Sequence, residues 1–194
     1  MTTTLNSAPD GQAVETAKSL RKLYFIRVAF SVSWVILVFL FAKKSAEIAT
    51  ILLIIYPAWD VFGTFMDIRA NRNTASKLPQ YINIAISAVT TIVIALALRD
   101  GVPMALTVFG GWAILTGLIQ LTLGLRRKKI MSGQWPMIIS GGQSMIGGTF
   151  TIISAHSADR GIPSLAAYVA FGAFYYLLAA YNLSKTINQS KSTT

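Results

Sequence analysis

The sequence predicts an all-α integral membrane protein with six transmembrane helices, arranged as three αα-hairpin repeats. Hydrophobic residues make up 54% of the 194-residue chain and charged residues only 12%, whereas a soluble domain carries about 25% charged residues. The apolar residues also gather in runs that are long enough to cross a bilayer. Because a backbone in hydrocarbon cannot bond to water, such runs must fold as helices packed into a bundle.

The predicted spans follow one another with short connections, at 23–42, 46–66, 81–98, 103–124, 135–155 and 163–183. Each run gives roughly 27–33 Å of helix, which matches the hydrocarbon core. We therefore expect one membrane domain, 23–185, between tails at 1–22 and 186–194. Apolar residues recur at helical spacing within 10–20, which is typical of a helix on the membrane surface; a disordered tail is the alternative.

The basic residues predict the orientation of these spans. Of the 17 lysines and arginines, only Lys43, Lys44, Arg99 and Arg160 lie in the connections on the membrane side opposite the two chain termini. By the positive-inside rule, both termini should lie in the cytoplasm. This distribution accounts for the net charge of +10 without nucleic-acid binding. The basic run at 126–129 is either a topology signal only or also a site for anionic lipid headgroups, formed by Arg126, Arg127, Lys128 and Lys129.

Residue usage excludes several kinds of site. The chain has no cysteine and one histidine, so disulfides, cysteine-type zinc sites and bis-histidine haem ligation within the chain are excluded. No catalytic or nucleotide-binding signature stands out. The sequence therefore predicts no catalytic residue, no cofactor and no metal site, and hence a non-enzymatic protein.

An internal repeat underlies the three predicted hairpins. Spans two, four and six align without gaps, and each carries a polar residue toward the cytoplasmic side: Asp67, Gln120 and Asn182. Spans one, three and five align in the same way and place Arg27, Asn83 and Gln143 at one position. We expect interhelical clamps within each hairpin, namely an Arg27–Asp67 salt bridge and the amide pairs Asn83–Gln120 and Gln143–Asn182. Such bonds are each worth about 0.6–2 kcal/mol in a membrane.

Span four also carries a recognisable motif. It has a Gly-x-Trp start at Gly110 and Trp112, a small-Gly centre at 116–117, a Gln-Leu step at 120–121 and a basic end at 126–129. In these features the chain resembles the HdeD-like family of short-repeat bacterial membrane proteins. The resemblance implies six spans in three hairpins in the bacterial inner (plasma) membrane. The family's named member is linked to acid resistance.

Asp60 is the strongest candidate for an intramembrane functional group. It lies nine residues before Arg69, hence about 13 Å from the cytoplasmic boundary, and a carboxylate at that depth is a functional hypothesis by default. A polar cluster of Asp60, Tyr175, Gln143 and Gln120 near a pseudo-threefold axis would form the site. The alternative is a structural role, with Asp60 as partner of Arg27 or Tyr175.

These observations favour a non-enzymatic membrane protein of the HdeD-like type. Such a protein would act in envelope or acid-stress tolerance through packing and through contacts with lipids or partners. The expected partners are membrane lipids, anionic ones included, and either further copies of the chain or another membrane protein. A small proton-coupled transporter or channel centred on Asp60 is the alternative. An accessory subunit of a membrane complex is a further alternative.

Overall fold

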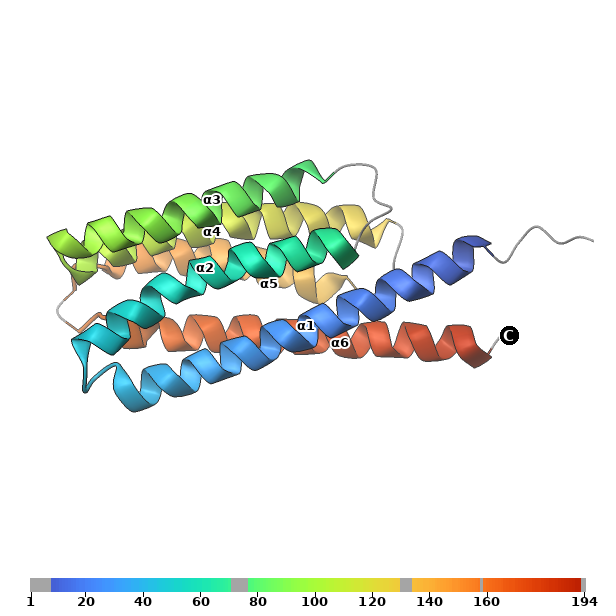
Figure 1. Ribbon diagram of the computed structural model, residues 1–194, viewed down its shortest axis with the longest axis horizontal. Helices are drawn as coiled ribbons and strands as arrows, with labels where there is room; N and C mark the ends of the chain where they lie inside the picture. The colour runs from blue at the N-terminus through green and yellow to red at the C-terminus, as the bar shows by residue number, and fades with distance from the viewer. Residues whose placement is uncertain (1–7, 71–76, 130–133, 158, 193–194) are drawn as a thin grey trace, which may run out of the picture.

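The computed structural model describes residues 8–70, 77–129, 134–157 and 159–192, and these fold almost entirely as helices (Figure 1). The first seven residues and the last two of the predicted tails lie outside the described part. Within it the α-helices are α1 (Ala8–Phe41), α2 (Ala46–Ala70), α3 (Leu78–Ala97), α4 (Val102–Lys128), α5 (Trp135–Ser154) and α6 (Leu165–Ser192). Two short 3-10 helices, η1 (Leu98–Asp100) and η2 (Ile162–Ser164), lead into α4 and α6.

The all-α fold predicted from the sequence is confirmed. Among the described residues, five helical segments are long and apolar enough to cross a membrane: Val14–Phe41, Ala46–Ala70, Leu78–Asp100, Val102–Lys128 and Ile162–Lys185. Helix α5 is not among them, and the polar and small residues at 140–144 lower its apolar content. Large apolar side chains such as Phe39, Ile146 and Ile153 are 72–76% exposed on the outside of the bundle. These features are those of an α-helical membrane protein, while a sixth span and the repeat stay predictions.

Helix α1 is continuous over 34 residues. The segment 10–20, expected as a surface helix or a disordered tail, is the beginning of this long helix. At 1.5 Å per residue α1 extends about 51 Å, more than the roughly 30 Å of a hydrocarbon core. Its early part continues as helix because Ala17 and Leu20 are buried in a cluster with Ala180, Leu183 and Ile187 of α6.

The helices form a closed ring in chain order. Each helix packs against the next, and α6 packs against α1. The start of α1 and the end of α6 lie at one end of the bundle, here called the terminal end. The α1–α2 connection, η1 and η2 lie at the other, here called the turn end (Figure 1).

The closest packing does not occur within the predicted hairpins. The most extensive contacts join α4 to α5, α1 to α6 and α2 to α3, whereas α1–α2, α3–α4 and α5–α6 touch less. Glycines explain the α4–α5 contact, because a Cβ on Gly110 would lie 2.6 Å from the carbonyl oxygen of Gly148. Small residues thus allow the close helix approach expected from the sequence, but toward the next hairpin.

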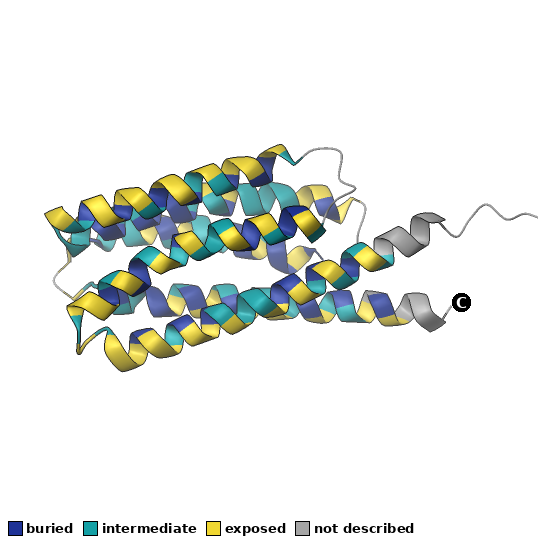
Figure 2. Ribbon diagram, in the orientation of Figure 1, coloured by how far each residue is buried: buried dark blue, intermediate teal, exposed yellow. Residues whose placement is uncertain are grey.

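The two ends of the bundle have different cores. The turn end holds a large apolar cluster in which Trp34, Leu53, Ile94, Phe109 and Val169 are at most 1% exposed. A smaller apolar cluster lies at the terminal end, formed mainly by α1 and α6. Buried residues run as a stripe along the inward face of each helix (Figure 2). Polar side chains occupy the interior between these clusters.

The turns before α4 and α6 have matching sequences, Gly101-Val102-Pro103 and Gly161-Ile162-Pro163, but they differ in conformation. Gly101 has φ 107°, a left-handed value that favours glycine, and Pro103 then occupies the first turn of α4. Gly161 in the second turn is extended, and Pro163 lies in η2 rather than in α6. Similar sequence at the two turns therefore gives two different backbone paths.

Candidate functional site

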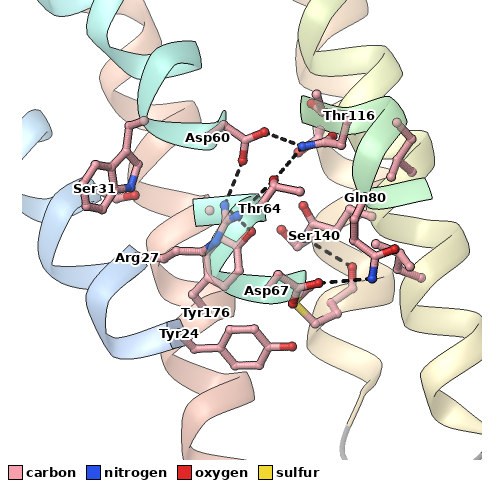
Figure 3. Close-up of a pocket in the computed structure, with 18 of the residues that line it drawn as sticks. Tyr24, Arg27, Ser31, Asp60, Thr64, Asp67, Gln80, Thr116, Ser140 and Tyr176 are labelled. Atoms are coloured by element: carbon pink, nitrogen blue, oxygen red, sulfur yellow. Dashed lines mark hydrogen bonds and ion pairs between the residues drawn. The ribbon is translucent and has the colours of Figure 1, made fainter. Parts of the chain in front are cut away.

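A polar cavity of about 100 Å³ lies inside the ring, and each of the described α-helices contributes side chains to it (Figure 3). Helices α1 to α3 contribute Tyr24, Arg27, Ser31, Asp60, Thr64, Asp67, Gln80 and Asn83, and α4 to α6 contribute Thr116, Gln120, Arg127, Ser140, Gln143, Ser144, Tyr168 and Tyr176. A concave site with convergent polar groups is the default candidate for function.

Asp60 on α2 accepts three hydrogen bonds in this cavity. Its Oδ1 receives Nη1 of Arg27 at 2.9 Å. Its Oδ2 receives Nδ2 of Asn83 at 2.6 Å and the hydroxyl of Ser87 at 2.9 Å. The Asp60 side chain is 15% exposed and that of Arg27 13%. One carboxylate therefore joins α1, α2 and α3, and both of its oxygens are used (Figure 3).

Arg27 extends the network to α6. Its Nη1 also donates to the hydroxyl of Tyr176 at 3.2 Å, and its Nη2 lies 3.5 Å from Oγ1 of Thr64. The guanidinium carbon lies 5.3 Å from the centre of the Tyr176 ring, a cation–π contact. Gly63 makes this position accessible, since a Cβ there would lie 2.8 Å from the Cζ of Arg27.

Two further bonds carry the network to α4. Asn83 donates from Nδ2 to Thr64 at 2.8 Å, so it joins α3 to α2 twice. The indole nitrogen of Trp112 donates to the Ser87 hydroxyl at 2.9 Å. Ser87 is therefore at once an acceptor for α4 and a donor to Asp60.

A second ion pair lies closer to the terminal end. Nη2 of Arg127 on α4 lies 2.5 Å from Oδ2 of Asp67 on α2, and its Nη1 donates to the hydroxyl of Tyr24 at 3.4 Å. Gln80 of α3 donates to the same Asp67 oxygen at 3.4 Å. The two side chains of the pair are only 6% and 10% exposed, so this pair is more deeply buried than the first.

The predicted Arg27–Asp67 clamp is wrong, because the carboxylate bound to Arg27 is Asp60, the pairing given above as the alternative for Asp60. Asp60 lies two helical turns from Asp67, about 10 Å along α2. The prediction matched Arg27 and Asp67 by their depths below the membrane boundary. It missed the space beside Gly63 that receives the guanidinium, and it missed Arg127 as the partner of Asp67.

The two predicted amide clamps, Asn83–Gln120 and Gln143–Asn182, have different outcomes. Asn83 bonds to α2 rather than to Gln120, and Gln120 donates to the carbonyl of Met137 on α5 at 3.5 Å. Each side chain thus bridges toward the neighbouring hairpin instead of its own. The Gln143–Asn182 bond stays a prediction; Gln143 lines the cavity from α5, and Asn182 is half-buried on α6.

Three of the four residues of the predicted polar cluster lie around one cavity, while their role as a site stays a prediction. Asp60, Gln120 and Gln143 all line the cavity, whereas Tyr175 does not. The tyrosine at this site is Tyr176, one residue further on and hence turned by about 100° around the helix axis. Tyr175 lies instead in a separate groove between α5 and α6.

The prediction that the basic run at 126–129 lies at lipid headgroups is wrong for Arg127. It was expected at lipid headgroups with its neighbours, but it is 5% exposed and turns into the bundle. Its position could have been found from the sequence, since it continues the 3- and 4-residue spacing of Gly117, Gln120 and Gly124. Ser87 and Thr64 carry no comparable signal. Arg126, Lys128 and Lys129 are exposed, and their role at lipid headgroups stays a prediction.

The cavity can bind small polar molecules or hold structure together. The described part of the chain contains no group of three or more His, Cys, Asp or Glu side chains that could hold a metal ion. Gln80 is 1% exposed, and its Oε1 has no hydrogen-bond partner among the described residues. The interior thus keeps one hydrogen-bond acceptor available beside two compensated ion pairs.

Comparison with known proteins adds no relative to this picture. No family model, no curated protein and no solved structure matches the chain.

Proposed function

We propose that the protein is a non-enzymatic, multi-pass protein of the HdeD-like type in a bacterial inner membrane. It crosses the membrane six times as three hairpins, with both termini in the cytoplasm. It contributes to envelope or acid-stress tolerance through its packing and through contacts with lipids or a membrane partner. The polar interior serves to hold the helices in register.

The observation that carries this proposal is the pairing of the interior carboxylates. Asp60 is bound by Arg27, Asn83 and Ser87, and Asp67 is bound by Arg127. A carboxylate that is ion-paired and hydrogen-bonded is held in place rather than available for chemistry. Such groups join four helices of the ring, which is the expected behaviour of structural clamps.

The apolar turn end supports the same reading. Trp34, Leu53 and Phe109 are at most 1% exposed and belong to one continuous cluster on that side of the polar cavity. A pathway for ions would need polar groups or water along the whole bundle. The described residues that form the turn-end cluster are all hydrophobic.

The exposed basic residues support the orientation. Arg126, Lys128 and Lys129 extend from the terminal end of α4, where the positive-inside rule places the cytoplasm. Helix α5 is 20 residues long, about 30 Å, and exposes Ile146, Phe150 and Ile153. That length and surface suit a sixth span. Reporter fusions after residues 44, 100 and 160 should all report the outer side.

A proton-coupled transporter is the second candidate, and the cavity itself favours it. Asp60 lies on the cavity wall with 15% of its side chain exposed, so a proton or a small ion can reach it from inside the bundle. The two functions differ in what Asp60 must do. In the first it stays ionised and paired, and in the second it binds and releases a proton in each cycle.

Asp60→Asn tests the two functions against each other in vesicles that enclose a pH-sensitive dye. We expect vesicles with the wild-type protein to conduct no more protons than protein-free vesicles. Asp60→Asn should lower both the melting temperature of the protein and the acid tolerance of the cells that carry it. The exposed carboxylate variant Asp100→Asn is the control and should change neither. Proton flux in the wild type that disappears in Asp60→Asn, at unchanged melting temperature, would establish the transporter instead.

A further inference from the structure

A second concavity runs along the outside of the bundle between α5 and α6, and it shares only Gln143 and Tyr168 with the lining of the polar cavity. Its volume is about 750 Å³, within the roughly 300–1,000 Å³ of ligand sites. The α5 wall carries residues at helical spacing, Ile139, Gly142, Ile146, Phe150 and Ser154. The opposite wall carries Ser164 of η2 and Ala167, Phe171 and Tyr175 of α6. We call this the α5–α6 groove.

The groove exists because α5 is drawn toward α4. A Cβ on Gly141 would lie 2.7 Å from the carbonyl oxygen of Gly117, and a Cβ on Gly148 would lie 2.5 Å from that of Gly110. On its other side α5 contacts α6 through Tyr168, whose hydroxyl donates to Ser144 at 3.2 Å, and through Met137 near the terminal end. Between this contact and the outside, the faces of the two helices stay apart.

The residues that line the α5–α6 groove are apolar in its middle and include a positive charge at its turn end. Its middle is apolar, with Ile146 74%, Phe150 53% and Phe171 55% exposed. At the turn end the guanidinium carbon of Arg160 lies 4.8 Å from the centre of the Phe150 ring, over the mouth of the groove. Among the described residues no carboxylate lies within 4.0 Å of Arg160, although the neighbouring Asp159 is exposed.

The dimensions favour an acyl chain over a protein helix. From Ile139 to Ser154 the α5 wall is about 22 Å long at 1.5 Å per residue. The volume of about 750 Å³ then gives a mean cross-section of about 34 Å². A helix at least 10 Å wide has a cross-section of roughly 80 Å², so the groove matches an extended acyl chain more closely than a helix of a second copy.

We propose that the α5–α6 groove binds an anionic phospholipid. One acyl chain lies along Phe150, Ile146 and Phe171, and the phosphate lies at Arg160. A guanidinium suits this role because it offers several donors in a fork that matches phosphate oxygens. The placement of Arg160 at the outer membrane boundary rests on the proposed function, but the complementarity of groove and lipid does not.

Two pairs of variants test the proposal by native mass spectrometry of the purified protein, with phosphatidylglycerol and phosphatidylcholine of identical acyl chains. Arg160→Gln should lower the affinity for phosphatidylglycerol about fivefold and leave phosphatidylcholine unchanged. Its control is Arg99→Gln, at the matched turn before α4, which should change neither lipid. Arg99 lies outside the α5–α6 groove.

The second pair fills the groove. A Cβ on Gly142 or on Gly111 meets nothing within 4 Å, but only Gly142 lines the groove. Gly142→Leu should lower the binding of both lipids about tenfold, and Gly111→Leu should leave it unchanged. If Gly142→Leu does not fold, Ala167→Phe fills the same groove from α6.

The proposal is overturned if Arg160→Gln retains wild-type lipid preference, if Arg99→Gln loses it equally, or if the filled groove binds lipid normally. It is also overturned if Gly142→Leu converts a wild-type dimer into a monomer, since the occupant would then be a second copy. Reporter fusions that place Arg160 in the cytoplasm would refute the proposed topology instead, while the binding ratios would still decide about the groove.

Discussion

The two ends of the bundle are held together by different forces. At the turn end, aromatic and aliphatic side chains such as Trp34, Leu53 and Phe109 fill the interior. Toward the terminal end, one partly buried and one buried ion pair join the helices together with their hydrogen bonds. In lipid, packing of apolar side chains gains little from the exclusion of water, because the surroundings are apolar as well. Apolar packing can therefore fill the turn end, but it specifies less about which helices are neighbours.

The polar half supplies that specificity. Asp60 has donors on α1 and α3, and Asp67 has its ion-pair partner on α4. A rotation or slip of any of these helices would leave a charge unpaired in a poorly solvating interior. The comparison teaches that charged residues near one end set the arrangement of the bundle, while the apolar residues at the other end only have to fit.

The largest effect should come from removing one member of an ion pair. Arg27→Met leaves Asp60 with Asn83 and Ser87 alone, and we expect it to lower the free energy of unfolding by about 3–5 kcal/mol. The double variant Arg27→Met/Asp60→Leu should recover most of this loss, because no unpaired charge then remains. Unfolding by SDS in mixed micelles measures both. Additive losses in the double variant would contradict the role of the pair as a clamp.

A cavity in the turn-end core should cost less. Leu53 is fully buried, and Leu53→Ala removes packing contacts without leaving a charge, so we expect a loss of about 2–3 kcal/mol. The control is Ile92→Ala, since Ile92 is 63% exposed on the outside of α3 and its loss should be near zero. If Leu53→Ala and Arg27→Met lowered the free energy of unfolding equally, the two ends of the bundle would not differ in how strongly they are stabilised.

The smallest effect should come from the hydroxyl that links the networks. Ser87→Ala removes one donor to Asp60 and the acceptor for Trp112, and we expect a loss of about 1–2 kcal/mol. Thr122→Ala is a suitable control, because its exposed hydroxyl donates only to the carbonyl of Leu118 within its own helix. An effect no greater than that of Thr122→Ala would show that Asp60 needs only Arg27 and Asn83.

The sequence predicted which polar residues lie in the interior more accurately than it predicted which of them bind each other. Asp60, Gln120 and Gln143 were expected in the interior, and all three line the cavity. The clamp partner was wrong for Arg27, because matching by depth selected Asp67 instead of Asp60 on the same helix. It was wrong for Asn83, because its partner was sought inside its own hairpin. Short turns keep two helices adjacent, but they do not determine which faces meet. Close contact goes instead to helices with small residues on facing sides, such as Gly110 and Gly148.

By itself, the sequence determined the helical class of the protein, the approximate position of each helix and the presence of charges inside the bundle, but not that α1 begins at Ala8. Hydropathy and helical spacing act locally, so they can be read from a single chain. Only the tertiary structure decided that Arg27 pairs with Asp60, that Arg127 turns inward and that α5 leaves a groove beside α6. These outcomes depend on helix rotation and depth, where one residue means a turn of about 100°, as Tyr175 and Tyr176 illustrate.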